Sequence, residues 1–288
     1  MIDIEAALEY ARRHRLEALV VACGEDVIAE AYGDAFERDT AHKLFSGTKS
    51  FWGIAAIIAE WEELLSLDEP VADTLESWRA DPWKRRVTFR MLLSLTAGHA
   101  FGGLGAGVPS FESAIELPLV NEPGTAFTYT GISLQVFGAA FARKLAPLGL
   151  TPQQYLNVRV LRFAHAHLAG WRTLPDTTQP LPTGASMDAT NWLAFGRYSL
   201  MHRASFSECF RGSSANPRYG LGWWLEGPHD DGPADMYYAS GSGGQGLYCI
   251  PELDVTAVHF GAGGSYKHDA MLRRLTGRHA TRGAVRNL

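Results

Sequence analysis

At residues 45–59 the chain reads FSGTKSFWGIAAIIA, a serine and a lysine three positions apart followed by an almost uninterrupted apolar run. A helix that is apolar on all sides belongs in the interior of a protein. We therefore expect a buried helix that opens at Ser46. In such a helix Ser46 and Lys49 share one face, one turn apart and within hydrogen-bond reach.

Burial of this helix would give the pair of Ser46 and Lys49 a chemical role. Removal from water disfavours the charged form of a lysine, so the pKa of Lys49 should fall. A neutral lysine can accept the hydroxyl proton of Ser46 and make it a nucleophile. A bare Ser-x-x-Lys more often means an N-capping serine and an exposed lysine, but a buried helix is an unfavourable place for an unpaired lysine.

The flanking sequence places strands toward both ends of the chain and helices between them. β-prone or aromatic runs occur at Ala18–Ala22, Val27–Ala31, Tyr219–Leu225, Gln245–Ile250 and Val255–Phe260. Helix starts are indicated at Thr88, Thr151 and Asp188, and a last helix at Lys267–Leu275. This order predicts an α+β fold. Residues 1–75 and 190–288 would form the sheet domain, residues 76–189 an inserted all-helical subdomain, and the active site would lie in the cleft between them.

Several motifs, taken in order, resemble those of the penicillin-recognising serine hydrolases of the class C β-lactamase type. They are SGTK at residues 46–49, VTFRMLLSLTAGH at 87–99, PGTAFTY at 123–129, YGLGWW at 219–224, and GSGGQ at 241–245 followed by PELD at 251–254. The resemblance runs from about Val20 to Phe260. It implies a β-lactamase/transpeptidase-like fold, three layers α/β/α with an antiparallel five-stranded sheet, plus the inserted helical subdomain.

The resemblance also implies roles for individual residues. Tyr129 would lie opposite Lys49 across Ser46 and, as a phenolate or through a shared proton, act with Lys49 as general base and acid. The alternative is a purely structural role, in which Tyr129 is a core tyrosine whose hydroxyl donates a hydrogen bond to a backbone carbonyl. The oxyanion hole needs only backbone N–H groups, here those of Ser46 and Ser242.

Two departures from the family pattern concern the substrate-binding positions. The Tyr-x-Asn motif ends in Gly131, so the asparagine that would bind a substrate amide is missing. The third motif reads Ala239-Ser240-Gly241 and lacks the cation that would face a substrate carboxylate. Losing such a charge-assisted contact costs about 1.5–3 kcal/mol. The departures favour neutral esters or small amides, unless an arginine from elsewhere supplies the charge.

The predicted function is therefore that of a serine hydrolase that cleaves a carboxylic ester or small amide through an acyl-enzyme on Ser46. The alternatives are a β-lactamase or D,D-peptidase and, third, a non-catalytic binding relative.

The chain lacks the Gly-x-Ser-x-Gly elbow of α/β-hydrolases. His165 and His167 have no third ligand in the sequence pattern, so no metal site is expected there. Trp223 and Trp224 should face opposite sides of a strand, one toward the core and one toward the cleft.

Composition limits the possible binding partners and the cellular location of the protein. The 288 residues carry a net charge of −5, without the clustered basic face that a nucleic-acid partner would need. No apolar run approaches the ~20 residues of a membrane span. We expect a small-molecule ester or amide as the partner, no cofactor, and a cytoplasmic location, or a periplasmic or secreted one if a leader is removed. Nothing in the sequence favours a particular oligomeric state. The three cysteines, Cys23, Cys209 and Cys249, are expected to be buried free thiols.

Overall fold

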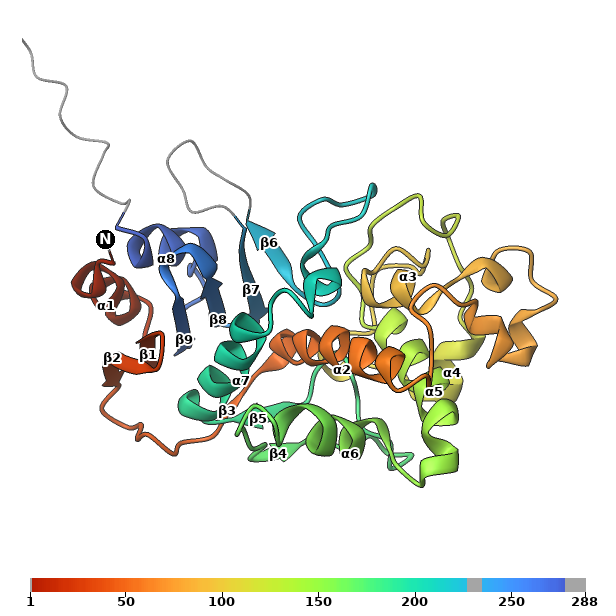
Figure 1. Cartoon of the computed structure of the whole chain (residues 1–288), viewed down its shortest axis with the longest axis horizontal. Helices are drawn as coiled ribbons and strands as arrows, with labels where there is room; N and C mark the ends of the chain where they lie inside the picture. Colours follow the sequence, from red (N-terminus) through yellow and green to blue (C-terminus); the bar gives the residue numbers. More distant parts are fainter. Residues whose placement is uncertain (1, 227–234, 278–288) are drawn as a thin grey trace, which may run out of the picture.

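The fold is built on one antiparallel sheet with helices on both of its faces, as a computed structural model describes it for residues 2–226 and 235–277 (Figure 1). The sheet has six strands in the order β2-β1-β9-β8-β7-β6, and β3, β5 and β4 form a second, three-stranded sheet. The strands are β1 (Leu16–Cys23), β2 (Asp26–Tyr32), β3 (His42–Lys43), β4 (Gly170–Trp171), β5 (Ala185–Met187), β6 (Trp224–Glu226), β7 (Met236–Gly241), β8 (Gln245–Ile250) and β9 (Val255–Gly261). The helices are α1 (Ile4–Arg13), α2 (Ser50–Trp61), α3 (Phe89–Leu93), α4 (Phe111–Glu116), α5 (Ile132–Leu145), α6 (Pro152–Leu156), α7 (Ala189–Met201) and α8 (His268–Leu275).

Strand alternation divides the interior into two cores. In β1, Leu19 and Val21 point into a core shared with α1 and α8, whereas Val20 points into the larger core shared with α2 and α7. Both faces of the central strands are therefore apolar, which explains why these strands read as hydrophobic runs. The predicted three-layer α+β architecture is confirmed.

The number of strands in the main sheet differs from the expected five. The strand that has no counterpart among the five runs identified in the sequence is β7, which pairs with β6 on one side and with β8 on the other. The predicted strand Tyr219–Leu225 begins only at Trp224, because the amide of Gly220 donates to the carbonyl of Trp223 and closes a turn before it. Trp223 is buried and Trp224 only half-buried, on the opposite side of the chain.

The buried helix also begins later than expected. Residues Phe45–Lys49 form a 3-10 turn, and the α-helix α2 starts at Ser50. In a 3-10 turn the side chains at i and i+3 eclipse one another, so Ser46 and Lys49 still share one face. Nearly every residue of α2 is buried, as its composition predicts.

The predicted helix starts are confirmed by their caps. Thr88 accepts a hydrogen bond from the Met91 amide, Thr151 forms a capping box with Gln154, and Asp188 accepts from the Asn191 amide. These interactions span three residues each, which is why the local sequence was sufficient to predict them.

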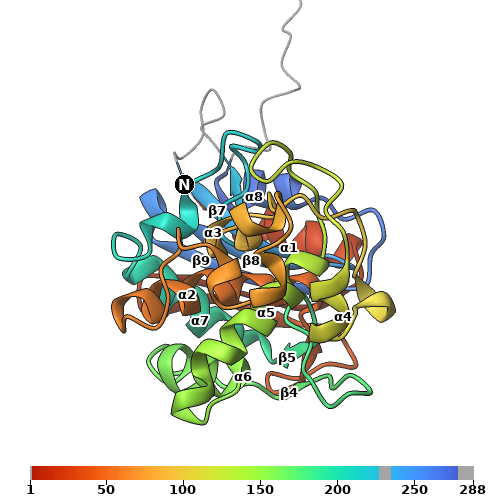
Figure 2. The same ribbon diagram turned by 90° about the vertical axis from the view of Figure 1, so that its right-hand side faces the viewer.

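Helices α3, α4, α5 and α6 gather on the side of the molecule that faces the viewer in Figure 2. Helix α7 packs against β9, β1 and β8. The small sheet joins β3 to β5 and β4, so residues 170–187 reach back to His42 and Lys43. The division into a sheet domain, residues 1–75 and 190–288, and a helical subdomain, residues 76–189, stays a prediction. The segment 190–288 includes residues 227–234 and 278–288, which lie outside the described residues.

Two predictions from composition can be compared with the fold. Cys209 and Cys249 are buried free thiols as expected, but Cys23 is only half-buried, because it ends β1 at the rim of the sheet. Within residues 2–226 and 235–277 no helix is long and apolar enough to cross a bilayer.

Candidate active site

Ser46 lies in a tightly held turn. The preceding residue, Phe45, has a φ of 47°, a left-handed conformation that is unfavourable for a bulky residue. The turn is anchored by the Leu44 amide, which donates to the Ala185 carbonyl of the small sheet at 2.9 Å, and by the Gly47 amide, which donates to the Leu44 carbonyl. Backbone strain held by surrounding structure is found most often at functional sites.

Lys49, from the same turn, is a polar neighbour of Ser46. Its side chain is 1% exposed, with Nζ 2.8 Å from Ser46 Oγ and 3.0 Å from the Pro182 carbonyl oxygen. Burial lowers the pKa of Lys49 to about 7. The predicted fall of this pKa is confirmed, so a substantial share of Lys49 is neutral near neutral pH.

Tyr129 lies beside the same pair. Its ring stacks on Trp224 with a centroid distance of 5.6 Å, and Lys49 Nζ is 4.9 Å from its centroid. Burial raises the pKa of Tyr129 above its usual value, and a hydrogen bond with Ser46 opposes this only in part. The site therefore stabilises the phenol rather than the phenolate. Of the two forms considered for Tyr129, the neutral one that shares a proton fits this environment.

A cavity of about 410 Å³ opens beside Ser46. Its lining consists of hydroxyl groups, aromatic rings and backbone: Ser46, Tyr129, Trp224, Tyr238, Ser240, Gly241, Ser242 and His268. The predicted residues Ser46, Tyr129, Ser240, Gly241 and Ser242 thus come together around one space. Trp224 lines it while Trp223 lies in the core, as the strand pattern suggested. No arginine is found among these lining residues of the described chain.

Gly131 and Ala239 are not among the residues that line this cavity. Gly131 is buried at the start of α5, and a Cβ there would lie 1.8 Å from the carbonyl oxygen of Gly103. Ala239 is 1% exposed and faces the larger core, because Tyr238 and Ser240 on either side of it face the cavity. The position that lacks the family's asparagine therefore has no room for any side chain.

Replacing Gly131 with asparagine is accordingly expected to destabilise the protein by about 2–4 kcal/mol instead of adding an amide-binding group. The backbone of Gly103 must move to admit the new side chain. Thermal unfolding of the variant measures this effect. Gly107→Asn is the matched control, because a Cβ at Gly107 meets no atom within 4 Å. Equal melting temperatures for the two variants would contradict the explanation.

Three contributors to the site were not among the residues predicted from the sequence. The Pro182 carbonyl reaches Lys49 from a loop 133 positions away, Tyr238 comes from β7, and His268 is the first residue of α8. The alternation of β7 around Ser240 could have identified Tyr238. The other two depend on how distant segments pack.

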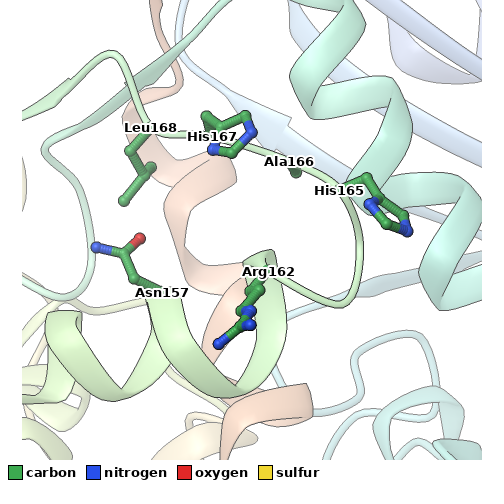
Figure 3. A pocket seen from close by; sticks show the side chains of 6 residues that line it. All are labelled: Asn157, Arg162, His165, Ala166, His167 and Leu168. Atoms are coloured by element: carbon green, nitrogen blue, oxygen red, sulfur yellow. The ribbon is translucent and has the colours of Figure 1, made fainter.

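A second cavity, of about 480 Å³, lies next to α6 (Figure 3). Arg162, His165 and His167 are among its lining residues, but the two imidazoles project in different directions (Figure 3). Within the described ranges there is no group of three or more His, Cys, Asp or Glu side chains that could hold a metal ion.

Comparison with known proteins places this geometry in context. The model of the Beta-lactamase family matches residues 4–278. No curated protein sequence matches the chain. Similar solved structures include a penicillin binding protein from Bacillus halodurans, with 20% identity over 92% of this chain and 97% of that one and a TM-score of 0.70. The D-stereospecific amidohydrolase from Streptomyces sp. has 15% identity, 95% and 98% coverage and a TM-score of 0.73. EstCE1, a hydrolase with promiscuous acyltransferase activity, has 17% identity, 95% and 98% coverage and a TM-score of 0.74. At identities this low, the structural similarity establishes the fold alone, which is β-lactamase/transpeptidase-like.

Proposed function

The chain belongs to the Beta-lactamase family, and from this premise we propose that it is a serine hydrolase that cleaves a carboxylic ester or a small amide through an acyl-enzyme on Ser46. The observation that carries the proposal is the 2.8 Å contact between Ser46 Oγ and a buried lysine whose pKa is about 7. A lysine of this kind is suited to act as a base toward a serine hydroxyl. The similarity to the hydrolase EstCE1 and to the D-stereospecific amidohydrolase supports this reaction class.

The proposed acylation step uses three side chains. Neutral Lys49 accepts the hydroxyl proton of Ser46 as Oγ attacks the substrate carbonyl carbon. The backbone amides of Ser46 and Ser242 donate to the oxyanion. The phenol of Tyr129 passes a proton to the leaving alcohol or amine. In the second half of the cycle the resulting phenolate accepts a proton from the water that attacks the acyl carbonyl carbon, and Lys49 returns its proton to Ser46 Oγ as the bond between Oγ and the acyl group breaks.

The lining of the cavity favours substrates without a net charge. None of its side chains carries a permanent charge, and Lys49 is covered by protein. A substrate carboxylate placed there would lose hydration without meeting a cation. A β-lactamase or D,D-peptidase, whose substrates carry that carboxylate, is therefore the second candidate. A small-molecule partner and a cytoplasmic location remain part of the proposal.

Intact-mass measurement with two substrates tests the proposed function. The protein is mixed in parallel with a short-chain p-nitrophenyl ester and with a chromogenic cephalosporin. We expect a burst of p-nitrophenol and a mass increase equal to the acyl group with the ester. An adduct with the cephalosporin alone would favour the penicillin-recognising alternative, and the absence of any adduct would favour a non-catalytic relative.

The pKa of Lys49 predicts the pH dependence of this reaction. The unprotonated lysine is the active base, and its share grows as pH rises through about 7. We expect kcat/KM for a neutral ester to fall about tenfold per pH unit below that value and to level off at roughly one pH unit above it. A pH profile measured with an uncharged substrate checks this. A profile that stays flat from acidic to neutral pH would exclude Lys49 as the base.

A further inference from the structure

A chain of hydrogen bonds leads from the cavity beside Ser46 into the interior. Ser240 Oγ lies 2.8 Å from His268 Nε2, and His268 Nδ1 lies 2.7 Å from the hydroxyl of Tyr248. The Tyr248 hydroxyl also lies 2.7 Å from that of Tyr266. Of these four residues, Ser240 and His268 line the cavity, and Tyr248 and Tyr266 support the pair from behind.

The members of this chain are held in place by the sheet and by ring packing. Tyr248 in β8 pairs with Tyr238 in β7, and Ser240 pairs with Gly246. A Cβ at Gly246 would lie 2.3 Å from the Tyr248 hydroxyl, so the glycine makes room for that group beneath Ser240. The His268 ring stacks on Tyr238 at 5.2 Å. The imidazole is thereby fixed in position and in orientation.

One order of donors along these hydrogen bonds satisfies every hydroxyl group. If Tyr266 donates to Tyr248, then Tyr248 donates to His268 Nδ1, and Nε2–H donates to Ser240 Oγ. In the reverse order the Tyr266 proton would need another acceptor, and within the described ranges the Tyr266 hydroxyl contacts only that of Tyr248. A part-buried hydroxyl proton without an acceptor is unfavourable. With the first order every proton is used, and the Ser240 hydroxyl proton is left to point into the cavity.

The imidazole contributes this hydrogen bond without contributing charge. Burial lowers the pKa of His268 to about 4, so the ring is neutral at physiological pH. The strand that carries a cation in the family motif here presents a neutral hydroxyl from Ser240, while Ala239 faces the core. A neutral donor suits a carbonyl or ether oxygen, since a carboxylate would need a compensating charge.

We propose that Ser240, positioned by His268, donates a hydrogen bond to an uncharged acceptor oxygen of the substrate beyond the scissile bond and so selects neutral, oxygen-bearing esters over carboxylate-bearing ones. This inference rests on the proposed function and specifies its substrate class. Ser240 would contact the substrate, and His268 would act as a positioning residue that keeps the serine proton directed into the cavity.

Three p-nitrophenyl esters of similar length test the proposal: the methyl succinate, the hydrogen succinate and the hexanoate. For the wild type we expect kcat/KM to be highest with the methyl succinate and lowest with the charged hydrogen succinate. In Ser240→Ala the advantage of the methyl succinate over the hexanoate should fall by about 3–10-fold, through KM. Ser240→Thr retains the hydroxyl and should keep the advantage. His268→Ala should lose part of the methyl succinate advantage, again through KM.

The outcomes separate this proposal from the one on which it rests. Acyl adducts that form with all three esters, together with an unchanged methyl succinate advantage in Ser240→Ala, would overturn the role of Ser240 alone. A wild type that prefers the hydrogen succinate would also overturn it. If none of the three esters formed an acyl adduct, the proposed hydrolase function would be overturned, and this inference with it.

Discussion

Replacing Ser46 with alanine is expected to abolish the acyl adduct and to lower kcat with a p-nitrophenyl ester by at least about 10⁴-fold. The hydroxyl oxygen of Ser46 is the atom that would bond to the acyl group, and alanine removes it without changing the turn that Leu44 and Ala185 anchor. Residual turnover would come from the cavity and the backbone amides. Burst kinetics and intact mass measure the loss.

The matched control is Ser66→Ala, a serine-to-alanine change at an exposed position away from the cavity. It should retain the burst and the adduct. Because Ser46 lies on a well-anchored turn, Ser46→Ala should also unfold at nearly the wild-type temperature. An acyl adduct that persists in Ser46→Ala would show that another residue is the nucleophile and would exclude the proposed mechanism.

Replacing Lys49 with methionine is expected to lower the activity and to raise the stability of the protein. The variant loses the base that lies 2.8 Å from Ser46 Oγ, so kcat should fall by about 10³–10⁴-fold. Methionine has a similar length and carries no charge to bury, so the free energy of unfolding should rise by about 1–3 kcal/mol at neutral pH. Activity assays and thermal unfolding measure the two effects.

The stability gain in Lys49→Met should depend on pH in a defined direction. The pKa of Lys49 is lowered in the folded state from its ordinary 10.5 to about 7, so the unfolded chain binds more protons between these values. The free energy of unfolding of the wild type therefore rises with pH across that window. The difference in unfolding free energy in favour of Lys49→Met is largest below about pH 7. Lys43→Met, at an exposed lysine, is the control. A Lys49→Met variant less stable than wild type at pH 6 would contradict this account.

The sequence by itself determined the features that depend on neighbours a few residues away. Ser46 and Lys49 share a face because three positions make about one turn of either helix type, and α2 is buried because its residues are almost all apolar. The caps at Thr88, Thr151 and Asp188 were equally predictable, since each cap and its partner lie within three residues. The family motifs extended this local information to Tyr129 and to the strand that carries Ser240.

Only the tertiary structure decided what surrounds these residues. The Pro182 carbonyl meets Lys49, His268 meets Ser240, and the Gly103 backbone fills the space beside Gly131 because segments far apart in the chain pack together. The preference for a neutral phenol at Tyr129 likewise depends on burial by Trp224 and its neighbours. Desolvation and close contact are properties of the packed interior, and no local pattern encodes which distant group will provide them.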